Sequence, residues 1–282
     1  MDKQPLFSRP INWKWKVIGN GGLLSQISGY RDCIINELTK AQSIDIWGDF
    51  ERATMDVCGG PSVAHKLKLQ VMKNMDEIKY VILPVDLTHA SSVVTWGVAD
   101  DVSAERALSQ RLPNARFYGA DVNPMSKPAY TSLPNSQFSE NVIGPKDGKG
   151  TNVVWYHKGP TNNRQLQVRT SMMQRQGMWT FFVSYKLTRI DHLWMDIENG
   201  EYEILPELTR QSMRDHNITI CQMNVEMHHL DNKEQNRVTL LTKMMHETPF
   251  VPINVEFHWA AGHMRVAWIN IECKYCSKTY AL

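Results

Sequence analysis

The chain has 282 residues, 42% of them hydrophobic, which is enough for one α/β domain of ordinary size or two smaller domains. Its formal net charge of +2 comes from interspersed acids and bases, so the composition demands neither a nucleic-acid partner nor an anionic membrane. Five cysteines are too few for a disulfide scaffold, no apolar run is long enough to cross a bilayer, and the start lacks a signal-peptide core, so we expect a cytoplasmic protein.

The first 80 residues are expected to pack as an extension on a main domain formed by residues 81–282. Residues 1–30 hold two prolines and several glycines, which predicts a loosely packed segment. The spacing of apolar residues predicts helices over residues 31–40 and 63–75. A short strand follows over residues 78–83 and is stopped by Pro84.

The most informative stretch begins with a β-branched run at residues 93–96, which predicts a buried strand. It breaks at Gly97, resumes as a helical pattern over residues 103–112, and continues into a second short strand that ends at Asp121. Strand, glycine turn, helix, strand and acid form the first half of a nucleotide-binding α/β unit. In such units the glycine lets the backbone approach the ligand, and the acid accepts hydrogen bonds from ribose hydroxyls.

The loop of this unit differs from a dinucleotide fingerprint because it has one glycine rather than three. Val98 follows Gly97, and Ala99 stands where a second glycine would be. Asp100 and Asp101 precede the helix and would repel a phosphate group. This pattern favours a ligand with a ribose and a positive charge but no phosphate, such as S-adenosylmethionine. An ordinary βαβ turn with solvated acids is the alternative.

The middle of the chain is less regular. Residues 123–135 contain three prolines and no periodicity, which predicts a loop that could cover a bound ligand. Short strands are expected within residues 137–144 and over residues 153–156, joined by a glycine-rich turn. Residues 164–188 are basic and Met-rich with no clear period, so no element is assigned to them.

Two later strands, over residues 192–198 and 219–228, alternate between apolar and polar side chains. A central parallel strand is usually apolar on both faces, so each polar face needs either solvent or a polar cleft. In open α/β sheets the cleft lies at the carboxyl ends of the strands. The candidate catalytic residues near those ends are Asp196, Glu198, Glu226 and His228.

These four side chains are open to three interpretations. His228 or Glu226 could act as a general base while Asp196 orients a ligand. The same groups could form a satisfied hydrogen-bond network behind the sheet. One imidazole and three carboxylates could also bind a divalent metal ion, although no second spaced histidine supports this.

The rest of the chain predicts helices and a closing hairpin. A helical pattern over residues 200–212 must kink or break at Pro206, and a second helix is expected over residues 231–247. Residues 251–259 and 263–271 alternate and predict an antiparallel hairpin at the end of the sheet.

Five motifs, in order, resemble the FkbM-type methyltransferases, most closely the branch expanded in nematodes. They are IKYVILP at residues 78–84, GVADDVSAE at 97–105, FYGAD at 117–121, LWMDIE at 193–198 and ICQMNVEMH at 220–228. The resemblance implies a Rossmann-like methyltransferase sheet, mostly parallel with a C-terminal antiparallel hairpin and with helices on both faces.

The resemblance also implies S-adenosylmethionine as methyl donor and O-methylation of a hydroxyl on a small molecule or glycan. From the charge distribution we expect no nucleic-acid partner. It assigns residues 97–101 to the cofactor turn, Asp121 to the ribose, and Asp196 with Glu198 to the family's Asp-x-Glu.

The sequence departs from this family pattern after the Asp-x-Glu. Asn199, Gly200 and Glu201 replace the usual Gly-Ala-Glu, and Val122 replaces a proline. If the turn requires a positive φ at residue 199, asparagine tolerates it best among non-glycine residues. A catalytically inactive Rossmann-like scaffold is therefore the alternative function.

Two short motifs are expected to be incidental. Asn217, Ile218 and Thr219 form a glycosylation sequon, but it abuts a predicted buried strand and would matter only in a secretory compartment. Cys273 and Cys276 form a single CxxC, whereas a structural zinc site needs four ligands, so we expect simple packing.

Overall fold

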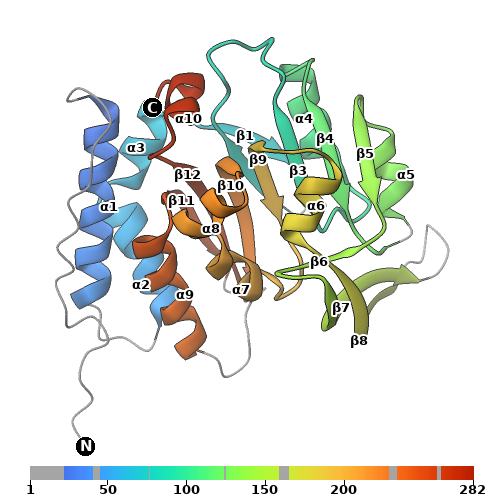
Figure 1. Ribbon diagram of the computed structural model, residues 1–282. Coiled ribbons are helices and arrows are strands. Elements are labelled where there is room, and N and C mark those ends of the chain that lie inside the picture. Colours follow the sequence, from blue (N-terminus) through green and yellow to red (C-terminus); the bar gives the residue numbers. More distant parts are fainter. Residues whose placement is uncertain are drawn as a thin grey trace, which may run out of the picture.

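The computed structural model of the protein describes residues 22–40, 45–75, 77–123, 125–158, 165–228, 234–258 and 262–282. Its centre is a seven-stranded sheet with the order β11-β12-β10-β9-β3-β4-β5 (Figure 1). Every neighbouring pair is parallel except the two pairs made by β12, which runs against both β10 and β11. The strands are β3 (Ser92–Trp96), β4 (Arg116–Ala120), β5 (Ser136–Ser139), β9 (Arg189–Met195), β10 (Thr219–His228), β11 (Phe250–His258) and β12 (His263–Asn270).

The strand order reverses beside β3, which pairs with β4 on one side and with β9 on the other. Right-handed crossovers on the two sides of such a switch point place helices on opposite faces of the sheet. Accordingly, α4 (Ser103–Arg111) and α5 (Ser126–Thr131) contribute to one buried cluster, while α6 (Met178–Ser184), α8 (Arg210–Asp215) and α9 (Glu234–Glu247) contribute to another. The expected Rossmann-like fold is confirmed.

The N-terminal segment is more ordered than expected where the structure describes it. Helix α1 (Leu23–Lys40) begins well before residue 31 and buries Ile27 and Tyr30, so the loose segment predicted up to residue 30 is wrong from residue 23 onward. Residues 1–21 lie outside the described part. Beside the β11 edge lie α1, α2 (Ile46–Glu51), the π-helical turn η1 (Arg52–Val57) and α3 (Gly60–Lys66) (Figure 1). The boundary at residue 80 stays a prediction.

Three local expectations differ from the structure. The helix predicted over residues 63–75 ends at Lys66, and β1 (Gln70–Lys73) pairs with β2 (Ile78–Val81) as an antiparallel hairpin. The loop predicted over residues 123–135 contains α5. The unassigned residues 164–188 form the long strand β8 (Gln165–Gly177) and α6. In each case pairing or packing with distant residues outweighs the local pattern.

Strand β8 belongs to a second sheet with the order β6-β8-β7, where β6 spans Val142–Gly144 and β7 spans Gly148–Lys158. The expected break at Pro206 is confirmed, because α7 (Glu201–Ile204), the short turn η2 (Leu205–Glu207) and α8 replace one continuous helix. The predicted antiparallel hairpin is confirmed as β11 and β12, with β11 at the edge of the main sheet.

Polar side chains of β10 hydrogen-bond to the backbone at the end of the β1–β2 hairpin. The Gln222 amide donates to the Ile82 carbonyl at 2.9 Å and accepts from the Ile82 N–H at 2.8 Å. Asn224 does the same with the backbone of Tyr80, at 2.8 Å and 2.7 Å. These two side chains therefore satisfy the backbone of β2, and this half of the polar face is neither solvated nor part of a cleft, contrary to expectation.

Two disulfides join four of the five cysteines, although this number of cysteines was too low to predict a disulfide scaffold. Cys33 on α1 is bonded to Cys58, with Cα atoms 5.8 Å apart, and Cys221 on β10 is bonded to Cys276 on α10 (Lys274–Tyr280), with Cα atoms 5.3 Å apart. Cys273 remains a thiol, and its Sγ accepts from the Cys276 N–H at 3.4 Å at the start of α10. None of the described helices is both long and apolar enough to span a bilayer.

Candidate active site

A cavity of about 640 Å³, including the part open to solvent, lies at the carboxyl ends of the central strands. Gly97 and Ala99 reach it from the loop after β3, Asp121 from the end of β4, and Asp196 with Glu198 from the end of β9. Sequence residues separated by a hundred positions therefore meet at the switch point of the sheet. The remaining lining residues are Ala120, Val122, Asn123, Asn141, Val142, Ile143, Asn152 and Ile197.

Gly97 is required by the crossing of two strand ends. Its φ is +76°, and a Cβ atom at this position would lie 1.5 Å from the carbonyl oxygen of Asp196. Ala99 also adopts a left-handed conformation, with φ of +54°, although it carries a Cβ. The backbone is therefore left-handed at both Gly97 and Ala99, as it would be in a loop with two glycines.

Asp121 organises this loop through three backbone N–H groups. Its Oδ2 accepts from Val98 at 2.8 Å and Ala99 at 2.9 Å, and its Oδ1 accepts from Asn123 at 2.7 Å. The side chain of Val98 is buried, so Val98 contributes to this loop through its backbone N–H. Because a carboxylate oxygen can accept two hydrogen bonds, Oδ1 retains capacity toward the cavity.

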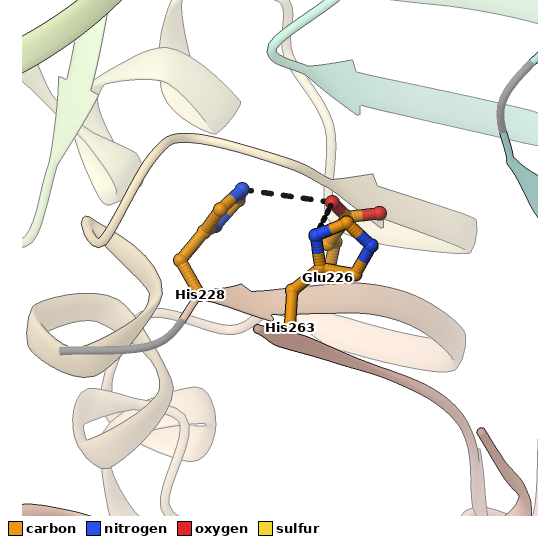
Figure 2. Close-up of side chains that lie close together, drawn as sticks. All are labelled: Glu226, His228 and His263. Carbon is orange, nitrogen blue, oxygen red and sulfur yellow. Dashed lines mark ion pairs between the residues drawn. The ribbon is translucent and has the colours of Figure 1, made fainter. Parts of the chain in front are cut away.

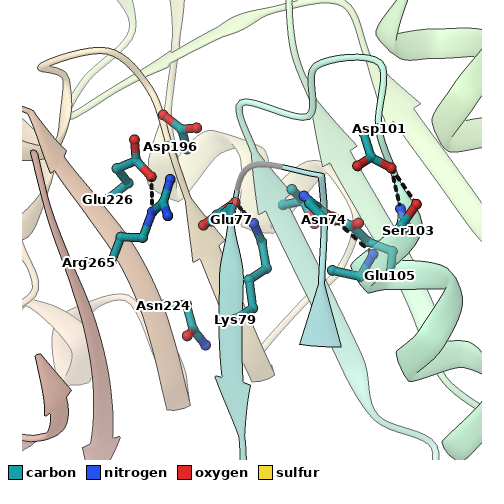
Figure 3. Close-up of polar contacts among 12 residues, drawn as sticks. Asn74, Glu77, Lys79, Asp101, Ser103, Glu105, Asp196, Asn224, Glu226 and Arg265 are labelled. Atoms are coloured by element: carbon teal, nitrogen blue, oxygen red, sulfur yellow. Dashed lines mark hydrogen bonds and ion pairs between the residues drawn. The ribbon is translucent and has the colours of Figure 1, made fainter. Parts of the chain in front are cut away.

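The other two acids of the loop have different surroundings. Asp101 Oδ1 accepts from the Ser103 N–H at 2.9 Å (Figure 3), and Oδ2 accepts from the Met75 N–H at 2.7 Å. These hydrogen bonds outweigh the effect of burial and hold the pKa of Asp101 below its usual value. Neither Asp100 nor Asp101 is among the described residues that line the cavity. Asp101 instead fixes the start of α4 and the β1–β2 turn.

His228 at the end of β10 is surrounded by four carboxylates. Its Nε2 lies 3.3 Å from Glu198 Oε2, 3.5 Å from Asp196 Oδ1 and 3.6 Å from Glu226 Oε1, while its Nδ1 lies 3.3 Å from Glu201 Oε1. Burial alone would lower the pKa of His228, but Glu201 and the other acids raise it to about 10. The imidazole therefore holds its proton at neutral pH.

Glu226 is paired with Arg265 and contacted by His263 on the neighbouring strand, and burial lowers the pKa of His263. In the antiparallel register, Glu226 lies opposite Arg265, and His228 lies opposite His263. Arg265 Nε donates to Glu226 Oε2 at 2.5 Å, and His263 Nδ1 lies 3.1 Å from Glu226 Oε1 (Figures 2 and 3). Both oxygens of Glu226 therefore have partners on β12, and Oε1 also faces His228 on β10.

Asp196 differs from Glu226 because it lines the cavity. One third of its side-chain surface is exposed. Burial and the neighbouring Glu226 raise the pKa of Asp196 well above its usual value, and His228 offsets part of this effect. The structure thus brings Asp196, Glu198, Glu226 and His228 together, but only Asp196 and Glu198 of these four are among the cavity-lining residues.

The turn after β9 supports this cluster with left-handed backbone. Glu198 and Asn199 have φ of +53° and +76°, so the expectation of a positive φ at residue 199 is confirmed. The buried Glu201 accepts from the Ile197 N–H at 2.8 Å and closes the turn. Two consecutive non-glycine residues in this conformation indicate a constrained site.

A second buried ion network lies on the hairpin side of the site and was missed in the sequence. Lys79 on β2 pairs with Glu77 and lies 5.5 Å from the Trp194 ring (Figure 3). Glu105 accepts from Thr95 Oγ1 at 3.1 Å, and burial raises the pKa of this carboxyl despite the nearby Lys79. His263 and Arg265 were also missed, because their roles depend on strand pairing rather than local pattern. The role of Glu201 was missed because it depends on the approach of His228.

Two groups in this region have donor atoms close enough to share one metal ion. Glu226, His228 and His263 form one group, and Asp196, Glu198 and His228 form the other, with the donor atoms of each group within 4.8 Å of one another. Mixed imidazole and carboxylate ligands suit divalent ions such as Mn²⁺ or Fe²⁺. His263 supplies the second histidine that the sequence argument lacked.

Comparison with known proteins gives the family. The family model described as "Methyltransferase FkbM domain" matches residues 88–265. No curated protein matches the chain.

The chain also has weak similarities to solved structures. Its superposition on a 16S rRNA (adenine(1408)-N(1))-methyltransferase from Catenulisporales acidiphilia covers 73% of this chain and 99% of that chain. The identity is 8% and the TM-score is 0.34. The mitomycin 7-O-methyltransferase MmcR gives 10% identity, coverages of 88% and 67%, and a TM-score of 0.31. The S-adenosylmethionine-dependent methyltransferase SibL gives 9% identity, coverages of 89% and 70%, and a TM-score of 0.32.

These scores are too low to support an argument about substrate. The family match, in contrast, spans more than half of the chain, including the whole cavity-forming part of the sheet. The chain therefore belongs to the FkbM family of methyltransferases.

Proposed function

We propose that the protein transfers a methyl group from S-adenosylmethionine to a hydroxyl group of a small molecule or glycan. One observation carries the proposal. The cavity at the switch point is lined by Asp121, Asp196 and Glu198 and by three asparagines, and no basic side chain is among its described lining residues. Such walls favour a cationic nucleoside and disfavour a phosphate-bearing one.

The described residues fit this cofactor. Gly97 lets the backbone form the cavity floor, and Asp121 Oδ1 can accept a hydrogen bond from a ribose hydroxyl. The carboxylates of Asp196 and Glu198 would offset a positive charge on the ligand. When bound, the cofactor supplies an already electrophilic methyl group.

Asp196 is the residue that we assign as proton acceptor. The sequence argument placed this role on His228 or Glu226, but His228 is protonated and Glu226 is bound to Arg265 and His263. Asp196 has a raised pKa and lines the cavity. A carboxylate of raised pKa is a stronger base toward an acceptor hydroxyl, and the His228 imidazolium would stabilise its charged form.

The acceptor side of the cavity supports a hydroxyl-rich substrate. Asn123, Asn141 and Asn152 line it. Asn141 Nδ2 donates to Ser139 and Gln176, and Asn152 is bonded to Gly150 and Arg175, so the Asn123 Nδ2 and the Asn141 Oδ1 are the amide groups that could meet a hydroxyl. Asn141 and Asn152 come from the β6-β8-β7 sheet region, where the sequence assigned little structure. Sugars and polyols present such mixed hydrogen-bonding groups, which supports O-methylation of a glycan or small molecule.

The experiment is a transfer assay with labelled S-adenosylmethionine and a panel of hydroxyl-bearing small molecules and glycans. Asp196→Asn should lower turnover by roughly 10²–10⁴-fold, the usual contribution of a general base, measured at saturating S-adenosylmethionine because the substitution also removes a carboxylate that lines the cofactor cavity. Glu140→Gln is the matched control, because Glu140 is an exposed carboxylate paired with Lys127. Wild-type turnover in Asp196→Asn would refute the assignment.

A divalent cation at the same place is a second candidate mechanism. His228 directs Nδ1 toward Glu201 and Nε2 toward Asp196 and Glu198, and a metal-binding histidine is commonly oriented by a carboxylate in this way. A cation held there would lower the pKa of an acceptor hydroxyl. Turnover that is lost with a chelator and restored by Mn²⁺ would favour the cation, and turnover that is insensitive to the chelator would favour Asp196.

A further inference from the structure

The Asn217 sequon lies on an exposed turn at the edge of the sheet opposite to the cavity. Asn217 is exposed and has φ of +53°, and it joins α8 to the first residue of β10. Its N–H donates to the Arg214 carbonyl at 3.0 Å, while the next residue, Ile218, is buried and anchors the turn. The sequon abuts a buried strand, as expected, but the asparagine itself lies outside that strand and is exposed.

The two disulfides are an independent observation that also points to a secretory compartment. Stable disulfides form and persist in oxidising compartments and are rare in the reducing cytosol. Cys221 and Cys276 are both buried, and their bond ties α10 to the central strand β10. Cys33 and Cys58 tie α1 to the segment before α3. A cytoplasmic location would leave these four cysteines reduced.

We propose that the protein matures in the lumen of the secretory pathway and carries an N-linked oligosaccharide on Asn217. The Asn217 side-chain nitrogen forms a bond to the anomeric carbon of the sugar, and the bond from that carbon to the pyrophosphate of a lipid-linked oligosaccharide breaks. The lipid pyrophosphate leaves, and the amide nitrogen loses one proton. Each disulfide forms by exchange with an oxidised thiol oxidoreductase, which accepts two electrons and two protons.

The position of Asn217 is compatible with an active methyltransferase. The site residues lie at the carboxyl ends of the strands, and His228 is the last residue of β10, whereas Thr219 is the first. At 3.3 Å per residue, the strand separates the turn from His228 by about 30 Å. His216, beside the sequon, stacks on Trp179 with ring centroids 4.2 Å apart and stiffens the outer face of this turn. A glycan here would extend from the face opposite to the cavity.

The proposal is tested on the protein isolated from its natural cells. Peptide mapping after treatment with peptide N-glycosidase should show Asn217 converted to aspartate, with a matching increase in gel mobility. Thiol alkylation without reduction should label Cys273 and leave the other four cysteines unlabelled. Unmodified Asn217 in the natural protein would overturn the proposal, whatever the state of the cysteines. Alkylation of all five cysteines without prior reduction would overturn the lumenal location.

Variants expressed in a secretory host behind a cleavable signal sequence test the residues. Asn217→Asp and Thr219→Val should abolish the glycosidase-sensitive mobility shift, and Thr219→Ser, which preserves the sequon, should retain it. Aspartate tolerates a positive φ, so Asn217→Asp should fold. Asn36→Gln, at an exposed asparagine on α1 outside any sequon, is the matched control and should keep the full shift. A shift that persists in Thr219→Val would overturn the assignment to Asn217.

Discussion

Gly97→Ala tests whether the cavity floor depends on the close crossing of two strand ends. A residue with a Cβ in left-handed conformation costs roughly 1–2 kcal/mol. The added Cβ would lie 1.5 Å from the Asp196 carbonyl oxygen, and relieving such an overlap in a packed region costs about 1–3 kcal/mol more. We therefore expect the free energy of unfolding to fall by roughly 2–5 kcal/mol and the loop to move away from Asp121.

Two other glycines separate the cost of the left-handed conformation from the cost of the steric overlap. Gly59 has φ of +84° but nothing within 4 Å of an added Cβ, so Gly59→Ala should lose only the conformational part, roughly 1–2 kcal/mol. Gly29 lies inside α1 with open space around it, so Gly29→Ala should gain about 1 kcal/mol from helix propensity. Urea unfolding with linear extrapolation measures all three variants. A loss in Gly97→Ala no larger than in Gly59→Ala would refute the steric argument.

Three further predictions concern stability. Cys276→Ser opens the 55-residue loop closed by Cys221 and should lower the free energy of unfolding by about 4 kcal/mol. Gln222→Leu leaves a buried N–H and carbonyl of the β2 segment without partners and should cost roughly 1–3 kcal/mol. Burial lowers the pKa of His192 to about 4, so the unfolded chain binds this proton more tightly, and stability present above pH 6.5 is lost as the pH falls toward 4. Between pH 7 and 4.5 this loss should reach about 2.5 kcal/mol.

Each of these predictions has a control. Cys273→Ser removes the unpaired thiol and should change stability little, and equal losses in the two cysteine variants would contradict the pairing. Gln211→Leu replaces an exposed glutamine on α8 and should be nearly neutral. His192→Leu should flatten the acid-induced loss of stability, and an unchanged pH profile in this variant would contradict the assignment to His192.

The sequence was most informative where local pattern and tertiary environment agree. The β3 strand, Gly97, α4 and β4 were predicted because a β-branched run, a glycine and a helical period follow one another within thirty residues. The break at Pro206 was predictable because proline lacks an N–H donor. The positive φ of Asn199 was predictable because asparagine tolerates this conformation.

The sequence was least informative where function depends on pairing between distant strands. Glu226 appeared to be a free base, yet Arg265 lies opposite to it across the β10–β12 register. Gln222 appeared to need solvent, yet its amide binds the backbone of Ile82, 140 residues away. Disulfide partners are likewise set by three-dimensional proximity, so Cys221 and Cys276 could not be paired from their spacing.

Calorimetric titration with S-adenosylmethionine is the most direct test of the proposed cofactor site. We expect binding of wild-type protein with a micromolar Kd, about −8 kcal/mol, and loss of binding in Asp121→Ala. Asp86→Ala is the control, because Asp86 is an exposed loop residue that accepts a hydrogen bond from Thr88 at the opposite end of the strands. This variant should bind the cofactor like the wild type. A folded wild-type protein that does not bind the cofactor, or an Asp121→Ala variant that binds equally well, would contradict the account.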